Sequence, residues 1–89
     1  MTWFCYMLRC ADDTLYCGIT NDLEKRFAAH NGGTGAKYTR SRTPVELVFS
    51  ETCDDRSNAS RRELVIKSLT REKKLALILA RTTPEWLDP

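Results

Sequence analysis

The chain lacks any long apolar run and any N-terminal leader pattern. Across its 89 residues no hydrophobic stretch approaches the ~20 residues that a bilayer-spanning helix needs. The N-terminus also lacks a charged segment followed by an extended apolar one, which is the pattern of a secretion signal. We therefore expect a cytoplasmic protein without membrane association. A chain of this length also predicts one domain with one modest core.

Histidine and closely paired cysteines are scarce, which narrows the chemistry. His30 is the single histidine, and none of the four cysteines forms a Cys-x-x-Cys pair. A structural zinc site would have too few suitably spaced ligands, so free thiols are expected. No Gly-x-Ser-x-Gly elbow is present to support a catalytic triad. A nucleotide-binding P-loop is also excluded, because Ala36 separates Gly35 from Lys37 and a helix is expected before the loop.

Positive charge is clustered, although the net charge is only +2. Residues 25–42 contain five cations and no acid, and residues 56–74 contain seven cations and two acids. Cations gathered on one surface favour a polyanionic partner such as nucleic acid. Two ordinary solvated helices would give the same pattern, so charge alone leaves both interpretations open.

The first twenty residues predict a β-hairpin. Residues 3–9 and 15–20 alternate between two faces, and a short polar turn separates them. Tyr6 and Tyr16 fall on the same face of this hairpin, and Gly18 leaves a space beside Tyr16.

The rest of the chain predicts a third strand and three helices. Asn21 and Glu24 fit a capping box for a helix ending near Asn31, and a basic loop is expected over 32–43. The third strand is expected over 45–52, with Val45, Leu47 and Phe49 on one face. Helices capped by Asp54 or Asp55 and by Thr70 are expected over about 56–69 and 71–81. The apolar residues of the first of these helices are Ala59, Val65, Ile66 and Leu69, and the second is expected to turn Leu75, Ile78 and Leu79 inward.

These elements predict an α+β fold, a three-stranded and mostly antiparallel sheet flanked by about three helices. We expect residues 1–82 to form the domain and residues 83–89, which contain two prolines, to form an irregular tail.

The polar residues available suit phosphodiester cleavage. That reaction needs a base for water, a cation or metal ion at the phosphate, and stabilisation of the leaving oxygen. A tyrosine can be the base when cations lower its pKa, one carboxylate can hold a largely hydrated Mg²⁺, and an arginine can clamp phosphate oxygens. Glu63 is the candidate carboxylate, although Glu63 and Lys67 at i, i+4 spacing also fit an ordinary helix-surface pair.

Taken together, the sequence resembles the GIY-YIG nuclease superfamily, and within it the small stand-alone bacterial YhbQ-like group. The strings that carry the resemblance are YxLRC, LYxGIT, DLxxR, HN, GAKYT, PVELV and RRE, in this order over about residues 3–80. The resemblance implies a GIY-YIG-like domain and a DNA endonuclease. Its reaction would use a tyrosine-activated water, an arginine and one glutamate-bound divalent metal ion, Mg²⁺ or Mn²⁺.

The resemblance also implies roles for residues at matching positions. Tyr6 and Tyr16 match the two motif tyrosines, one of which would activate the attacking water. Gly18 matches the motif glycine, beside which a phosphate or a metal-bound water would need room. Arg26 matches the arginine that contacts the scissile phosphate. His30 matches a position that hydrogen-bonds within the site.

Glu63 matches the metal-binding carboxylate, so the resemblance implies that it converges with Arg26 and His30 on the tyrosine-bearing face. The sequence departs from the family pattern in its first motif, which retains only the tyrosine. Other functions stay open because no asparagine follows Glu63 as it does in larger relatives, and because we see no appended DNA-binding domain of the kind that targets them. The alternatives are a non-catalytic nucleic-acid-binding module and a subunit that needs a protein partner. The residues expected to bind nucleic acid are Lys37, Tyr38, Arg40, Arg42 and Lys67.

Overall fold

The computed structural model describes the backbone of residues 2–82 and the side chains of residues 2–80. The expected tail at 83–89 lies outside the described residues. The elements follow the chain in the order β1 (Trp3–Arg9), β2 (Leu15–Thr20), α1 (Leu23–Asn31), α2 (Lys37–Arg40), β3 (Glu46–Cys53), α3 (Arg56–Ser68) and α4 (Arg71–Thr82). Within this described part, no helix is long and apolar enough to cross a membrane.

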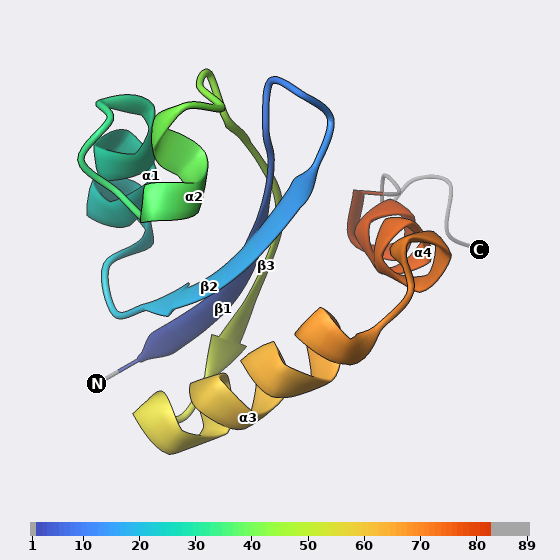
Figure 1. Ribbon diagram of the computed structural model, residues 1–89. Coiled ribbons are helices and arrows are strands. Elements are labelled where there is room, and N and C mark those ends of the chain that lie inside the picture. The colour runs from blue at the N-terminus through green and yellow to red at the C-terminus, as the bar shows by residue number, and fades with distance from the viewer. Residues whose placement is uncertain (1, 83–89) are drawn as a thin grey trace.

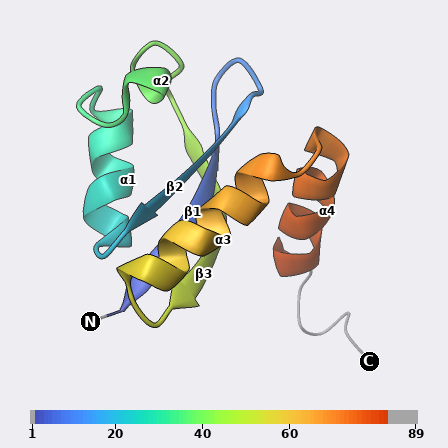
Figure 2. The ribbon, with the colours of Figure 1, turned by 60° about the horizontal axis from the view of Figure 1, so that its bottom comes forward.

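The three strands form one antiparallel sheet in the order β2-β1-β3, which confirms the predicted α+β fold. Helices α1 and α2 cover one face of this sheet, and α3 and α4 lie on the other (Figures 1 and 2). β1 is the central strand, and β2 forms a free edge that runs between the two helical layers. Side chains from α1 and α3 can therefore approach β2 from opposite faces.

Each face of the sheet has its own core. On the face of α1, which we call the tyrosine face, Tyr6, Leu8, Cys10 and Val45 are buried against Tyr16, Leu23 and Phe27. On the face of α3, which we call the cysteine face, Cys5, Met7, Cys17, Phe49 and Ile66 form a second cluster. The alternation predicted for the hairpin is thereby confirmed. The four cysteines are all free thiols, as expected.

The prediction that Val45, Leu47 and Phe49 share one face is wrong. Met7 pairs with Phe49 but Leu8 pairs with Leu47, so Val48 is an extra residue in a β-bulge. An extra residue shifts the alternation of a strand. Val45 therefore packs on the tyrosine face, and Phe49 packs on the cysteine face.

Several helix details also differ from the predictions. Asp22, not Asn21, caps α1 and accepts a hydrogen bond from the Lys25 backbone N–H at 3.1 Å. The expected basic loop contains the short helix α2. Asp55 caps α3 through the Asn58 N–H at 2.8 Å, which confirms one of the two predicted caps.

The predicted inward positions of Leu75 and Leu79 are wrong, because these side chains are 39% and 68% exposed. Helix α4 contacts the sheet at the outer strand β3, so only a narrow stripe of α4 is covered. That stripe contains Leu77 and Ile78, which contact the cluster on the cysteine face.

Candidate active site

The tyrosine face holds a buried chain of hydrogen bonds that starts at Tyr6. The Tyr6 hydroxyl lies 2.8 Å from Nε2 of His30, and Nδ1 of His30 lies 2.8 Å from Oγ1 of Thr39. Thr39 in turn donates its hydroxyl proton to the Ala36 carbonyl at 3.0 Å. Its oxygen therefore accepts from the Nδ1–H of His30, which leaves Nε2 to accept from the Tyr6 hydroxyl. This chain assigns both the tautomer of His30 and the direction of the Tyr6 hydrogen bond.

Burial governs the protonation of this chain. Burial, together with the nearby Arg26 charge, holds the pKa of His30 below its usual range, so the imidazole is neutral. Burial raises the pKa of Tyr6 to about 12, and a hydrogen bond from Arg26 opposes that rise. Tyr6 is 1% exposed and remains a protonated donor at neutral pH. Tyr6 therefore anchors the site and has little access to water.

The space beside Gly18 is occupied by the Tyr6 phenol. A Cβ at position 18 would lie 2.7 Å from the Tyr6 hydroxyl oxygen and 3.1 Å from the Tyr16 ring. Gly18 is the partner of Tyr6 in the β1–β2 register, so the missing side chain admits the phenol. The expectation that Gly18 leaves room for a phosphate is wrong, because the Tyr6 phenol already fills that room.

Gly35 and Thr39 support His30, and sequence reasoning assigned neither of them a role. A Cβ at position 35 would lie 2.5 Å from Nδ1 and 2.8 Å from Cα of His30, so only glycine fits there. Thr39 is fully buried within the short helix α2. Both residues belong to GAKYT, one of the strings that carry the resemblance, and this was the signal in the sequence that pointed to the loop.

Tyr16 lies between the buried chain and the surface. Its ring centroid is 5.3 Å from that of His30 and 5.8 Å from that of Tyr38, against which it stacks. The Arg42 guanidinium lies 4.0 Å from the centre of the Tyr38 ring. Arg42 also pairs with Asp12 at 2.9 Å and donates to the Tyr38 carbonyl at 2.7 Å. Tyr38 and Arg42 thus already have partners that hold Tyr16 in place, whereas Tyr16 itself is half-buried.

Arg26 connects the tyrosines to the surface. The Thr20 hydroxyl lies 3.1 Å from the Asp22 N–H, and the Arg26 N–H donates to the Asp22 carbonyl at 3.0 Å. These bonds fix the turn from β2 into α1, so the Arg26 side chain lies beside the end of β2. Burial raises the pKa of Tyr6 and Arg26 opposes that rise, so the guanidinium lies near the Tyr6 hydroxyl. The Arg26 side chain also lines two adjoining cavities of about 280 and 260 Å³. A phosphate at Arg26 would therefore lie next to Tyr6.

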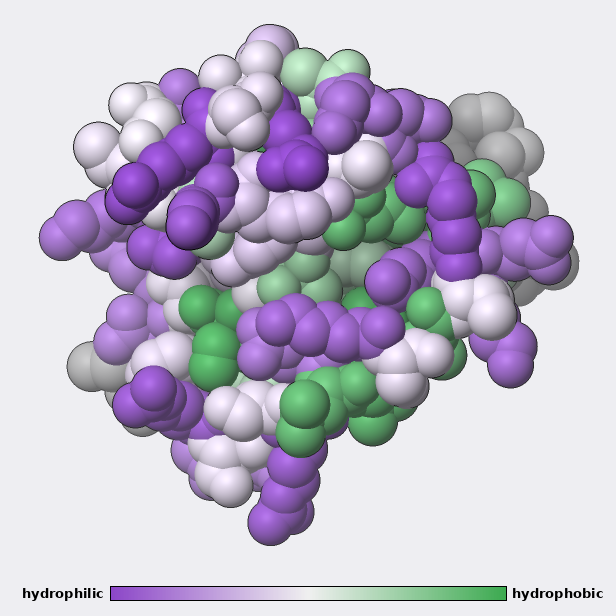
Figure 3. All heavy atoms as spheres, in the orientation of Figure 1, coloured by the Kyte–Doolittle hydropathy of each residue, from purple (hydrophilic) through white to green (hydrophobic). Residues whose placement is uncertain are grey.

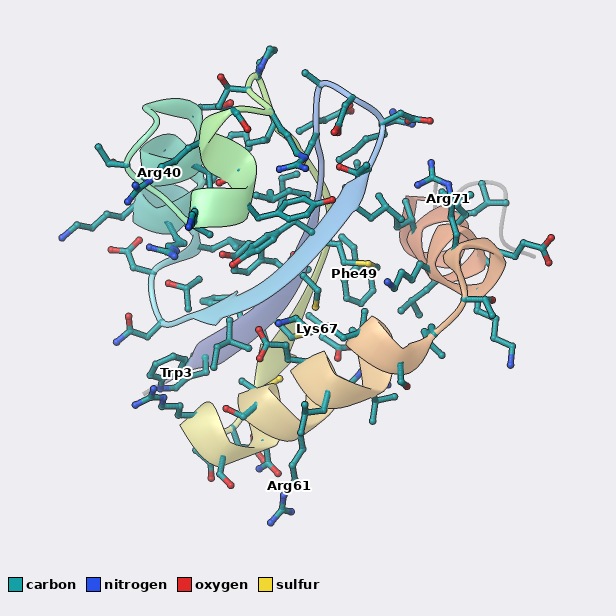
Figure 4. All side chains as sticks on the ribbon, in the orientation of Figure 1. Trp3, Arg40, Phe49, Arg61, Lys67 and Arg71 are labelled. Carbon is teal, nitrogen blue, oxygen red and sulfur yellow. The ribbon has the colours of Figure 1, made fainter. Side chains whose placement is uncertain are left out.

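The exposed cations expected to bind nucleic acid lie around this site. Lys37 and Arg40 are exposed on α2, and Arg40 lies on the outer surface of the α1–α2 layer (Figure 4). Hydrophilic atoms dominate the region over α1 and α2 at the left of the space-filling view (Figure 3). The Lys67 side chain instead lies beside β2 and pairs with Glu63 at 3.5 Å (Figure 4).

Glu63 does not join the other expected residues on the tyrosine face. Ala59 and Ile66, one turn before it and one turn after it on α3, are fully buried, so the same stripe of the helix turns Glu63 toward the sheet. Its carboxylate acts electrostatically on the Cys5 and Cys17 thiols, which belong to the cysteine face. The expected convergence on one face is wrong, because α1 and α3 cover opposite faces. Strand β2 separates Glu63 from Arg26.

The carboxylates and histidine provide few metal ligands. Among residues 2–80, no group of three or more His, Cys, Asp or Glu side chains is placed to hold a metal ion. The Glu63 side chain is 22% exposed, so water can reach its carboxylate. A single carboxylate fits a hard cation that keeps most of its waters, as Mg²⁺ does, and does not fit a closed protein cage.

Comparisons with known proteins identify the family to which this fold belongs. The family model of the GIY-YIG catalytic domain matches residues 2–76. UPF0213 protein DP2720 of Desulfotalea psychrophila is 53% identical over 79 residues, which cover 88% of this chain and 72% of the relative. UPF0213 protein CPE1444 of Clostridium perfringens is 51% identical over 82 residues, covering 92% and 88%.

A solved structure extends the match to three dimensions. The solution structure of UPF0213 protein BH0048 from Bacillus halodurans shares 38% identity with this chain at a TM-score of 0.62, covering 96% of this chain and 90% of that one. The names of these relatives state a family and no activity. GIY-YIG domains form a nuclease superfamily whose members act on nucleic acid and generally use a divalent metal ion. The chain therefore belongs to the GIY-YIG family, and within it to the UPF0213 proteins.

Proposed function

We propose that this chain is a divalent-metal-dependent DNA endonuclease. The observation that supports it most directly is the position of Arg26. This guanidinium lines two surface cavities at the end of β2, the strand that carries Tyr16. A cation at a surface cavity supplies the positive charge that phosphodiester hydrolysis needs at the phosphate.

We assign the two tyrosines different roles. Tyr6 is buried, protonated and hydrogen-bonded to His30, so it positions Arg26 and fixes the imidazole. Tyr16 is the more accessible phenol, so its phenolate form would accept the proton of the attacking water and become the neutral phenol. Arg26 holds the non-bridging phosphate oxygens in a bidentate manner as negative charge develops on them.

Glu63 would act from the opposite face. The scissile phosphate would lie over the free edge of β2, with Arg26 on the tyrosine face and Glu63 on the cysteine face. A hydrated Mg²⁺ or Mn²⁺ at Glu63 would supply positive charge to the phosphate and to the leaving oxygen. Lys67 pairs with Glu63 when no metal ion is bound. With a metal ion at Glu63, Lys67 would face the bound nucleic acid.

Cleavage of plasmid, single-stranded and branched DNA in Mg²⁺ or Mn²⁺ tests this proposal. We expect cleavage by the wild type that chelation of the metal abolishes. Glu63→Ala and Arg26→Ala should lower the rate by at least about 100-fold. Glu72→Ala, which removes an exposed glutamate from α4, is the control. Equal background cleavage by the wild type and Glu63→Ala would refute the nuclease proposal.

The ion pair between Glu63 and Lys67 favours a second candidate, a non-catalytic nucleic-acid-binding module. In this case the carboxylate only stabilises the surface of α3. DNA binding would be salt-sensitive but indifferent to Mg²⁺ and to Glu63→Ala, and no cleavage product would form with any substrate.

A further inference from the structure

A second basic cavity adjoins Arg26 at the end of the sheet where β1 and α3 begin and β2 ends. It has a volume of about 260 Å³ and is lined by Trp3, Ile19, Thr20, Asn21, Arg26 and Arg56. Trp3 lies at this end of the sheet beside the first turn of α3 (Figure 4). The cavity therefore brings a cation from α3 to the same space as Arg26 of α1.

The two arginines are available to an anion. Among residues 2–80, neither Arg26 nor Arg56 forms an ion pair with a carboxylate, whereas Arg9, Arg42, Arg62 and Arg71 each do. Two uncompensated guanidinium groups on one cavity repel each other and favour a bound anion. An anion there would neutralise both charges.

Trp3 fixes the position of Arg56. The Arg56 guanidinium carbon lies 5.7 Å from the centre of the Trp3 ring, within the range of a cation–π contact. The ring restrains an otherwise flexible side chain, so less conformational entropy is lost when the guanidinium binds a ligand. Arg56 is thus oriented in advance, although it is exposed.

We propose that Arg56 and Trp3 form a second phosphate subsite, which binds a phosphate of the same nucleic-acid strand next to the one held by Arg26. This inference rests on the proposed function, because it takes the ligand of Arg26 to be the scissile phosphate. The ligand of the subsite is a backbone phosphodiester, recognised by a guanidinium without reading the base. The subsite places the strand across the end of β2, from α1 toward the start of α3.

Arg61 provides a matched control for Arg56. It is on the same helix and exposed, but its side chain points away from the sheet (Figure 4). Arg56→Gln and Arg61→Gln remove the same charge from α3, so a difference between them reports the position of the charge.

The first experiment measures binding of fluorescein-labelled single-stranded and duplex oligonucleotides by anisotropy over a range of salt concentrations, in EDTA to prevent cleavage. Arg56→Gln should weaken binding by roughly threefold to tenfold and reduce the slope of log K against log salt by about one. Arg61→Gln should stay within about twofold of the wild type. Trp3→Leu should weaken binding less than Arg56→Gln, with the slope unchanged, because the charge remains.

The second experiment locates the phosphate. Oligonucleotides carrying one uncharged methylphosphonate linkage at successive positions are bound to the wild type and to Arg56→Gln. One linkage adjacent to the cleaved one should weaken wild-type binding and have no further effect on Arg56→Gln, as a double-mutant cycle requires for a direct contact.

The outcomes separate this inference from the function on which it rests. If the wild type binds and cleaves DNA but Arg56→Gln and Arg61→Gln are equivalent, the subsite is refuted and the nuclease proposal stands. If no linkage couples to Arg56, a direct phosphate contact is likewise refuted. If the wild type binds no nucleic acid at all, both proposals fail.

Discussion

The Tyr6 hydroxyl donates a hydrogen bond to Nε2 of His30 at 2.8 Å, in a space that is open only because Gly18 has no side chain. The pair joins the middle of β1 to the last turn of α1. It makes a buried tyrosine, which could have been only a core aromatic, part of a directed polar chain that ends at Thr39.

Gly18→Ala should destabilise the protein by about 1–3 kcal/mol, because the added methyl group overlaps the Tyr6 phenol. Gly35→Ala should cost at least as much, since its methyl group meets the His30 backbone, which cannot rotate away. Urea denaturation measures both. An unchanged midpoint for Gly18→Ala would show that the phenol has room to move.

Stability should decrease as the pH falls below the unfolded-state pKa of histidine, ~6.5. The pKa of buried His30 is lower in the folded state, so the unfolded state binds a proton first and is favoured in acid. Above about pH 7 the contribution of His30 should be complete and constant. Urea denaturation between pH 5 and 8 checks this, and the difference between wild type and His30→Gln isolates His30. A difference that does not vary with pH would contradict a depressed pKa.

Thr39→Val should lose about 1–3 kcal/mol of stability, because it leaves the Nδ1–H of buried His30 without an acceptor. Thr39→Ser keeps the hydroxyl and should retain most of the stability. Thr52→Val on the exposed side of β3 is the control. Thermal denaturation compares the three variants. A loss for Thr39→Val no larger than that of the Thr52→Val control would contradict a role for the hydroxyl, and a large loss for Thr39→Ser would report packing of the methyl group.

Tyr16→Phe and Tyr6→Phe should affect different quantities. If Tyr16 activates water, Tyr16→Phe should lower the cleavage rate by roughly 100-fold or more while stability changes little. Tyr6→Phe should mainly lower stability, because it leaves Nε2 of His30 without its donor. Single-turnover cleavage and urea denaturation, run on both variants, make the comparison. If Tyr6→Phe stays folded and loses more of the cleavage rate than Tyr16→Phe, Tyr6 would be the residue that activates water and Tyr16 the structural one.

Arg40→Ala and Arg42→Ala should also differ. Arg40 is exposed, so its removal should weaken DNA binding and lower the salt slope by about one without loss of stability. Arg42 contacts Asp12 and Tyr38, so its removal should lower stability and loosen the Tyr38 ring. Salt-dependent anisotropy and thermal denaturation distinguish the two. If the two variants have the same stability and the same DNA affinity, the contacts of Arg42 do not stabilise the fold.

The hairpin was predictable because its two faces follow the strict period of a strand. Tyr6 and Tyr16 on one side and Cys5 and Cys17 on the other are read directly from alternation. The same rule misplaced Phe49, because nothing in the local sequence marks the bulge at Val48. Contacts between distant segments were even harder to predict from the sequence.

The sequence named candidate residues for the site, but it did not predict how they are arranged. Tyr6, Arg26 and His30 were found through the resemblance, and the structure brings them together. That Glu63 approaches from the opposite face depends on how α3 crosses the sheet, which is tertiary information. The occupant of the space at Gly18 depends on the register of β1 against β2, which sequence spacing alone does not determine.

The fit between Tyr6 and Gly18 has a consequence for how the hairpin assembles. A slip of one residue would turn the side chains of one strand to the wrong face, and burial alone would reject it. A slip of two residues preserves both faces, so burial alone does not distinguish it from the native pairing. It would, however, set the Tyr6 phenol against Tyr16 or Thr20, neither of which offers the necessary gap. Gly18 therefore selects one register of β1 against β2, and in this register the Tyr6 hydroxyl reaches His30.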